Sequence, residues 1–260
     1  MKDLLTGKVV LISGGSQGLG AGVARAAARE GAAAVVVTGR RVEPGKQLET
    51  ELTEQGTPAL FVQTDVADAG QAVAAVEAAV TAFGRVDCLV NAAGLTDRGT
   101  LVDTTPELFD RHVAVNLRGP FFTMQAAVQD MLRRGAPGTV VNVISIAELG
   151  GQPYLAPYVA AKAGLAGLTR NAAHAHRWDR IRINGIDIGW TETEGEDLTQ
   201  RTFHDAGDDW LDKANASQPM GKLGQVDEIA DAVVFLLSDR SGVVTGSVLD
   251  WDQTVPGGSD

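Results

Sequence analysis

Three side chains suited to acid–base chemistry, Ser145, Tyr158 and Lys162, lie in the stretch "SIAELGGQPYLAPYVAAK". Tyr158 and Lys162 are four residues apart, a spacing that places two side chains on one face of a helix. A free phenol has a pKa of about 10, and a neighbouring ammonium favours its ionised form, which would make Tyr158 a usable general acid or base at neutral pH. Taken alone, such a pair is usually an ordinary surface pair, so its meaning depends on the elements that position it.

Those elements alternate regularly. β-branched runs such as "KVVLIS" and "AAVVVTG" are separated by alanine-rich helical stretches such as "GLGAGVARAAAREG". Apolar strands that alternate with helices are typical of a parallel sheet covered on both faces, because each crossover to the next parallel strand needs a helix. We therefore expect a doubly wound α/β sheet of about seven strands, with residues 1–260 forming a single domain.

Local signals mark several helix ends. Gly31 and Gly84 fall where helices are expected to stop, and Asp68 and Asp227 fall where N-caps are expected. One long helix is expected around "ELFDRHVAVNLRGPFFTMQAAVQDMLRRG".

A glycine-rich segment, "SGGSQGLG", lies directly between the first strand and the first helix, from Ser13 to Gly20. Glycines permit a tight turn and let backbone N–H groups approach a pyrophosphate, while the helix N-terminus offers partial positive charge. The strand–loop–helix context predicts a Rossmann-type dinucleotide site, with a plain glycine turn as the alternative.

The second strand indicates which dinucleotide is bound. It ends in "VVVTGRR", with Arg40 and Arg41 and no acid before Glu43. An acid there would hold a ribose hydroxyl, whereas an arginine accommodates a 2′-phosphate, so the pattern favours NADP(H) and leaves NAD(H) possible. Two alternatives remain: the arginines are solvated loop residues, and Gln17 stands in the loop where a basic residue would strengthen the NADP interpretation.

Composition narrows the partners. The net charge of -11 argues against nucleic acid, since phosphate backbones are bound by clustered Lys and Arg. The single cysteine, Cys88, excludes an intrachain disulfide and is typical of a reduced compartment, and no apolar run approaches membrane-spanning length. We expect a cytoplasmic protein with no membrane partner. His174, His176 and His204 lack ligand spacing, so no metal site is expected.

Taken together, these motifs resemble the short-chain dehydrogenase/reductase family in its single-domain branch, over nearly the whole chain. The resemblance rests on "SGGSQGLG", on "NAAG" at 91–94, on Asn116 in "HVAVNLRGP", on Ser145 and on "YVAAK". It implies that Tyr158 gives or takes a proton and that Ser145 orients the substrate oxygen. It further implies that Lys162 binds the nicotinamide ribose and, together with an oxidised nicotinamide, lowers the tyrosine pKa, and that Asn116 holds a water for proton relay.

The same resemblance implies cofactor contacts beyond Arg40, Arg41, Tyr158 and Lys162. They come from the glycine loop, the third strand end, the "NAAG" segment and the start of a lid: Gly14, Ser16, Gln17, Gly18, Leu19, Gly20, Asp65, Val66, Asn91, Ala92, Ala93, Gly189, Thr191 and Thr193.

A substrate lid is expected at about residues 189–220, opening with "GWTETEGED". Thr193 and Glu196 have capping-box spacing, so most acids here are expected to start a helix. Ile188 stands where the family usually has proline, which frees the backbone and changes the angle at which the lid enters.

The implied substrate wall is polar and aromatic. Its candidates besides Ser145 and Tyr158 are Glu148, Gln152, Trp190, Glu192 and His204. Carboxylates accept hydrogen bonds from hydroxyls and aromatic faces cover ring C–H groups, so a sugar, polyol or cyclitol would fit, unless these residues simply solvate a mobile loop.

The sequence therefore predicts an NAD(P)-dependent oxidoreductase that moves a hydride between nicotinamide and a secondary alcohol or ketone. The alternative is a dinucleotide-sensing or scaffold protein that kept the fold without the chemistry, which would be expected to lack the serine, tyrosine or lysine. The resemblance implies a homotetramer or a homodimer. After Leu249 the chain departs from the family ending, with Trp251 and a proline–glycine tail of unassigned role.

Overall fold

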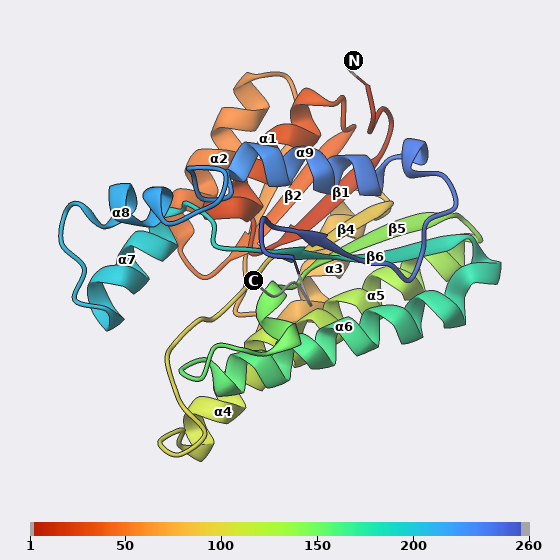
Figure 1. Cartoon of the computed structure of the whole chain (residues 1–260). Helices are drawn as coiled ribbons and strands as arrows, with labels where there is room; N and C mark the ends of the chain where they lie inside the picture. The colour runs from red at the N-terminus through yellow and green to blue at the C-terminus, as the bar shows by residue number, and fades with distance from the viewer. Residues whose placement is uncertain (1–2, 256–260) are drawn as a thin grey trace.

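The computed structural model describes residues 3–255 and contains one parallel sheet of seven strands in the order β3-β2-β1-β4-β5-β6-β7 (Figure 1). The strands are β1 (Val9–Ser13), β2 (Ala34–Gly39), β3 (Ala59–Gln63), β4 (Cys88–Asn91), β5 (Gly138–Val143), β6 (Ile181–Ile188) and β7 (Val248–Trp251). Every neighbouring pair is parallel, so the predicted doubly wound sheet is confirmed. The reversal of strand order beside β1 and β4 opens a crevice at the carboxyl ends of the strands, where such sheets bind ligands.

Two helical layers cover the sheet. The helices are α1 (Gly18–Arg29), α2 (Val42–Glu54), α3 (Ala69–Phe83), α4 (Pro106–Val113), α5 (Gly119–Arg134), α6 (Ala156–His176), α7 (Glu194–Phe203), α8 (Trp210–Ala216) and α9 (Val226–Leu237). Successive strand residues point to opposite faces, so Val10 packs with the α1, α2 and α9 layer and Leu11 with the α3, α5 and α6 layer. The remaining helices, α4, α7 and α8, lie beyond the carboxyl ends of the strands, with α7 and α8 at the left and α4 at the bottom in Figure 1. Within residues 3–255 no helix is both long and apolar enough to cross a membrane.

The long helix expected around residues 107–135 is interrupted. A π-helical turn at Ala114–Arg118 joins α4 to α5 and contains Asn116. Such turns insert one extra residue into a helix and occur frequently at functional sites.

Helix ends follow local chemistry, with one correction. Asp68 caps α3 by accepting hydrogen bonds from two backbone N–H groups at 2.8 and 3.1 Å. Gly84 ends the same helix at φ +79°, and Gly31 follows α1 at φ +82°, conformations that favour glycine. The prediction for Asp227 is wrong: α9 is preceded by Gln225 as its N-cap, and Asp227 lies in the first turn, where its charge favours the helix dipole instead.

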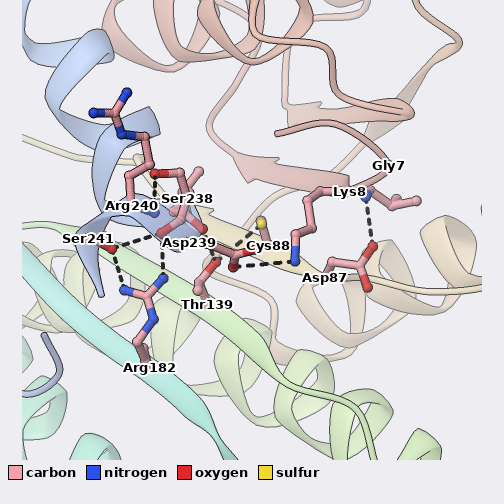
Figure 2. A network of polar contacts seen from close by, with 12 residues as sticks. Gly7, Lys8, Asp87, Cys88, Thr139, Arg182, Ser238, Asp239, Arg240 and Ser241 are labelled. Atoms are coloured by element: carbon pink, nitrogen blue, oxygen red, sulfur yellow. Dashed lines mark hydrogen bonds and ion pairs between the residues drawn. The ribbon is translucent and has the colours of Figure 1, made fainter. Parts of the chain in front are cut away.

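At the amino ends of the strands, opposite the crevice, a polar network fastens the end of α9 to the sheet (Figure 2). Arg182 at the start of β6 donates to the Ser241 hydroxyl at 2.5 Å and to the Ser238 carbonyl at 2.8 Å. Thr139 at the start of β5 donates to the Leu237 carbonyl at 3.1 Å and contacts the Cys88 sulfur at 3.2 Å. Because burial removes the Ser238 carbonyl from water, the Arg182 guanidinium provides it with a charged hydrogen-bond donor.

Arg182→Met should therefore lower the free energy of unfolding by about 2 kcal/mol, because it leaves partly buried carbonyl groups without a charged donor. Arg25→Met is the matched control, since its ion pair with Glu51 is exposed on α1 and α2 and should cost less than about 1 kcal/mol. Urea denaturation measures both values, and equal losses would show that the network has no special role.

Candidate active site

The carboxyl end of β5 and the first turns of α6 bring together the three reactive side chains predicted from the sequence. Ser145 lies two residues after the end of β5, and Tyr158 and Lys162 lie one helical turn apart on α6. Tyr158 is 8% exposed and Lys162 is 3% exposed. The Lys162 Nζ atom lies 5.6 Å from the centre of the Tyr158 ring and donates a hydrogen bond of 2.8 Å to the Val143 carbonyl. The lysine is therefore anchored to the sheet beside the phenol.

The Tyr158 hydroxyl is held in its protonated form. Burial raises the pKa of Tyr158 to about 12, although a hydrogen bond with the Ser145 side chain lowers it. The charge of Glu196 raises this pKa further and that of Arg98 lowers it. Burial outweighs the charge of Arg98, so the net shift in the protein by itself is upward, and the lowering by Lys162 together with an oxidised nicotinamide stays a prediction.

A buried carboxyl on β6, that of Asp187, opposes the effect of burial on the pKa of Lys162. Burial lowers the pKa of Lys162 to about 8, and the charge of Asp187 works against this shift. Asp187 is 1% exposed, and its Oδ1 atom has no hydrogen-bond partner within residues 3–255. Burial, reinforced by the charges of Glu148 and Asp250, raises the pKa of Asp187 to about 7. The site therefore contains two buried groups that change charge near neutral pH.

Asn116, on the π-helical turn, fixes the loop that follows β4. Its Oδ1 accepts from the Leu95 N–H at 3.0 Å, and its Nδ2 donates to the Leu95 carbonyl at 3.0 Å. The same Nδ2 contacts His112 Nδ1 at 3.2 Å, and His112 Nε2 lies 3.0 Å from the Asp97 carbonyl. These partners assign a neutral imidazole protonated at Nε2, in keeping with the burial that lowers the pKa of His112. The edge of this ring faces Tyr158, with the centroids 6.2 Å apart.

The glycine loop approaches its neighbours closely. A Cβ on Gly14 would lie 2.5 Å from the Ala93 Cα atom, and one on Gly20 would overlap the Gly14 carbonyl group. Gly18 has φ +52° and would aim a Cβ at Thr193 on the lid, 3.9 Å away. Gln17 precedes α1 without capping it, and the first turn of α1 contains no acid. The loop and the helix N-terminus thus present backbone N–H groups suited to an anion such as a pyrophosphate.

The lid starts with a β-bridge between Thr191 and Gly224, which is followed by a capped helix. The Trp190 carbonyl accepts from Gly224 N–H at 2.9 Å, and the Glu192 N–H donates to the Gly224 carbonyl at 3.0 Å. Thr193 caps α7 by accepting from the Glu196 N–H at 3.0 Å, as its spacing predicts. The Glu196 side chain does not complete the capping box: it accepts from Trp190 Nε1 at 2.7 Å instead and so ties the lid helix to its base.

Comparison with known proteins agrees with this geometry. A family model described as enoyl-(acyl carrier protein) reductase matches residues 14–254. The chain is 38% identical over 247 residues to an uncharacterised oxidoreductase of Thermotoga maritima, covering 95% of this chain and 96% of the relative. It is 36% identical over 248 residues to an L-rhamnose 1-dehydrogenase (NAD(P)(+)) of a Sphingomonas strain, covering 95% of each.

Among solved structures, a protein assigned as a short-chain alcohol dehydrogenase from Sinorhizobium meliloti superposes with a TM-score of 0.87 at 33% identity, covering 96% of each chain. The chain belongs to the short-chain dehydrogenase/reductase family. It is an NAD(P)-dependent oxidoreductase with a small-molecule substrate. The glycine loop fits that cofactor, because its backbone N–H groups suit a pyrophosphate. Only glycine fits at Gly14 and Gly20, where the loop approaches the neighbouring backbone closely.

The other expected cofactor residues lie at or just after the carboxyl ends of β2, β3 and β4. Arg40 and Arg41 follow β2 and are exposed. Asp65 follows β3 and accepts from the Ala67 N–H at 3.0 Å, and Val66 beside it is 8% exposed. The backbone of Ala92 and Ala93 adjoins Gly14, whereas Asn91 is buried, donates to Asn142 at 2.8 Å and leaves its Oδ1 without a partner in the described part of the chain.

The expected substrate residues divide into two groups. The first group comprises Ser145 and Tyr158, which hydrogen-bond to each other, and His204, which contacts Arg98. Trp190 donates to Glu196 and stacks on Trp210, with the ring centres 6.4 Å apart, while Glu192 accepts from Gln225 at 3.2 Å. Glu148 lies close enough to Asp187 to raise its pKa, and the Gln152 carbonyl accepts from the Leu155 N–H at 2.9 Å. Glu192 therefore joins the base of the lid to the segment before α9.

Three residues of this site were not singled out from the sequence. His112 opens the segment "HVAVNLRGP", in which only Asn116 was assigned a role, and Asp187 is one acid in a strand. Arg98 lies four residues after "NAAG" and ends a segment, residues 95–98, that the family resemblance places in the substrate wall, but it was given no role. Only the fold brings their side chains within reach of Tyr158 and Lys162. No group of three or more His, Cys, Asp or Glu side chains within residues 3–255 forms a candidate metal site.

Asp187→Asn should raise the free energy of unfolding by about 1–3 kcal/mol at a pH of about 8. Folding raises the pKa of Asp187 from 3.8 to about 7, so the folded state binds the proton more tightly. The parent is therefore most stable below the pKa that Asp187 has in the unfolded state, and this stability is lost as the pH rises through about 7. Asparagine does not ionise, so the variant does not lose stability in this way. The gain should shrink as the pH falls toward about 4.

Thermal and urea denaturation across this pH range measure the gain. Asp212→Asn, on the exposed side of α8, is the control for removal of one negative charge. A gain that did not depend on pH would contradict the assignment of a buried, ionising carboxyl.

Proposed function

We propose that this oxidoreductase interconverts a ketone and a secondary alcohol at Tyr158. The observation that supports this most strongly is the buried phenol, kept protonated and hydrogen-bonded to Ser145 with Lys162 beneath it. NAD(P)H, when bound, supplies the hydride to the carbonyl carbon. Tyr158 donates its proton to the carbonyl oxygen, the Ser145 hydroxyl donates a hydrogen bond to the same oxygen, and alcohol oxidation reverses these transfers.

The other two residues whose roles the family resemblance implies, Lys162 and Asn116, are proposed to act on the cofactor and on proton transfer. Lys162 is proposed to bind the nicotinamide ribose and to re-protonate the phenol, for which a pKa of about 8 is well matched to neutral solution. Asn116 is proposed to hold the water that links Lys162 to solvent. Gly189, Thr191 and Thr193 are proposed to meet the nicotinamide carboxamide at the start of the lid, residues 189–220.

NADP(H) is the proposed cofactor, with NAD(H) as the alternative. Arg40 and Arg41 are exposed at the end of β2, and Ser16 packs against Gly39 beside them. Two guanidinium groups next to a hydroxyl suit a ribose 2′-phosphate, to which arginine binds bidentately.

The proposed substrates carry several hydroxyl groups, as the name of the L-rhamnose dehydrogenase relative also suggests. Glu148, Gln152 and His204 come from two segments bordering the reactive tyrosine and supply acceptors and donors for hydroxyls. We also propose a cytoplasmic homotetramer, or a homodimer. Mass photometry reports the stoichiometry.

Tyr158→Phe should lower ketone reduction by about 10²- to 10⁴-fold, because the proton donor is removed. The assay follows NADPH absorbance with a panel of hydroxylated and apolar ketones, and fluorescence titration checks that the variant still binds NADPH. A variant that consumed NADPH as fast as the parent would contradict the mechanism. Binding of NADPH without turnover of any ketone by the parent would favour the dinucleotide-sensing alternative.

The double variant Arg40→Ser, Arg41→Ser should weaken NADPH binding by about 10- to 100-fold, because charge-assisted hydrogen bonds to the 2′-phosphate are lost. Binding of NADH should change by less than about 2-fold, since it lacks that phosphate. Arg25→Ser removes a guanidinium on α1 that is paired with Glu51 and serves as the control. Equal weakening for both cofactors would contradict the NADP assignment.

A further inference from the structure

Three segments that border the site meet around one guanidinium. Arg98 lies between β4 and α4, Tyr154 between β5 and α6, and Phe203 and His204 at the end of α7. The Arg98 guanidinium carbon lies 5.3 Å from the centre of the Tyr154 ring and 5.9 Å from that of Phe203. The aromatic faces position the guanidinium plane and leave its charge unneutralised.

Within residues 3–255, the hydrogen bonds of Arg98 go only to neutral acceptors. Its Nη1 atom donates to the Thr96 carbonyl at 2.7 Å. Its Nε and Nη2 atoms lie 3.1 and 3.0 Å from one atom, His204 Nε2. Partial burial and the charge of Arg98 lower the pKa of His204, which is consistent with a neutral imidazole that accepts here. Two parallel N–H donors thus share a single nitrogen.

Another arginine in the chain shows what that edge binds when a carboxylate is present. Arg25 Nε and Nη2 donate to the two oxygens of Glu51 at 2.7 and 2.8 Å. This bidentate arrangement is stronger than a bond to a neutral acceptor and matches the planar fork of the guanidinium. A carboxylate would therefore replace the imidazole at Arg98 and gain one hydrogen bond.

Arg98 is also placed to act on the bound substrate. Its charge lowers the pKa of the Tyr158 hydroxyl, which is proposed to protonate the substrate oxygen. Glu196, on α7, acts on the same hydroxyl with the opposite sign. The negative charge of Glu196 disfavours additional negative charge nearby, so the guanidinium suits a monoanion better than a dianion such as phosphate.

We propose that Arg98 is a specificity-determining residue that binds a carboxylate on the substrate through its Nε–Nη2 edge and displaces His204. The substrate class is then a hydroxy acid, with its oxo acid as the oxidised form. This inference rests on the proposed function of Tyr158 and names the substrate class of that same site.

The first test compares methyl ketones that differ only in charge: pyruvate, acetoacetate and levulinate, each beside its primary amide, with NADPH as reductant. For the best-fitting chain length, kcat/KM of the parent should be about 10- to 100-fold higher for the acid than for the amide. Arg98→Gln should bring this ratio close to one. Arg111→Gln is the matched control, because this neighbouring guanidinium is exposed and already paired with Asp97, so the ratio should keep its parental value.

The second test needs no turnover. Calorimetry compares isobutyrate with isobutyramide as ligands of the protein saturated with NADP⁺. The parent should bind the acid about 10-fold or more tightly than the amide, and Arg98→Gln should remove the difference. Equal binding of acid and amide by the parent, or a preference that survives in Arg98→Gln, overturns the inference.

The two proposals can fail separately. Reduction of ketones without any preference for acids leaves the function of Tyr158 intact and overturns the role of Arg98. Tighter binding of the acid that depends on Arg98, in a protein whose Tyr158→Phe variant reduces ketones as fast as the parent, supports the carboxylate site and overturns the proposed mechanism.

Discussion

The parallel direction of all seven strands is the constraint on which the rest of the structure depends. Parallel strands end at one edge, so every loop that leaves a carboxyl end enters the same crevice. Ser145 after β5, the glycine loop after β1 and the lid after β6 are far apart in the chain and meet for this reason alone. At the opposite edge, the polar network around Arg182 fastens the end of α9 to the sheet.

Burial sets the electrostatics of the site more than pairing does. Tyr158 is kept as a phenol, Lys162 is brought toward loss of its proton, and Asp187 is brought toward gain of one. Each shift has desolvation as its largest cause, and the neighbouring charges only adjust it. In each of the three groups, burial therefore favours the uncharged form of the side chain.

The sequence predicts what depends on local pattern. Strand and helix alternation predicted the sheet, and the strand–glycine–helix order predicted where α1 begins. Thr193 was predicted as a cap from its spacing. Residues whose role depends on distant neighbours could not be predicted in this way. Asp187 is buried because β6 pairs with β5 and β7 and packs against α6. The Glu196 side chain accepts from the Trp190 indole, a partner that capping-box spacing does not predict. The upward shift of the Tyr158 pKa could not be predicted for the same reason, since burial is a property of the packed protein.

The π-helical turn at Ala114–Arg118 has a consequence for how related chains are compared. One additional residue in a helix advances its phase by about 100°. The inward face of α4, with His112 fully buried against Tyr158, is therefore rotated relative to the face by which α5 packs on the sheet. A chain with the same residue types but one residue fewer in this stretch would present a different side chain to the tyrosine. In this region the length of the segment, rather than its composition, decides which residues are equivalent.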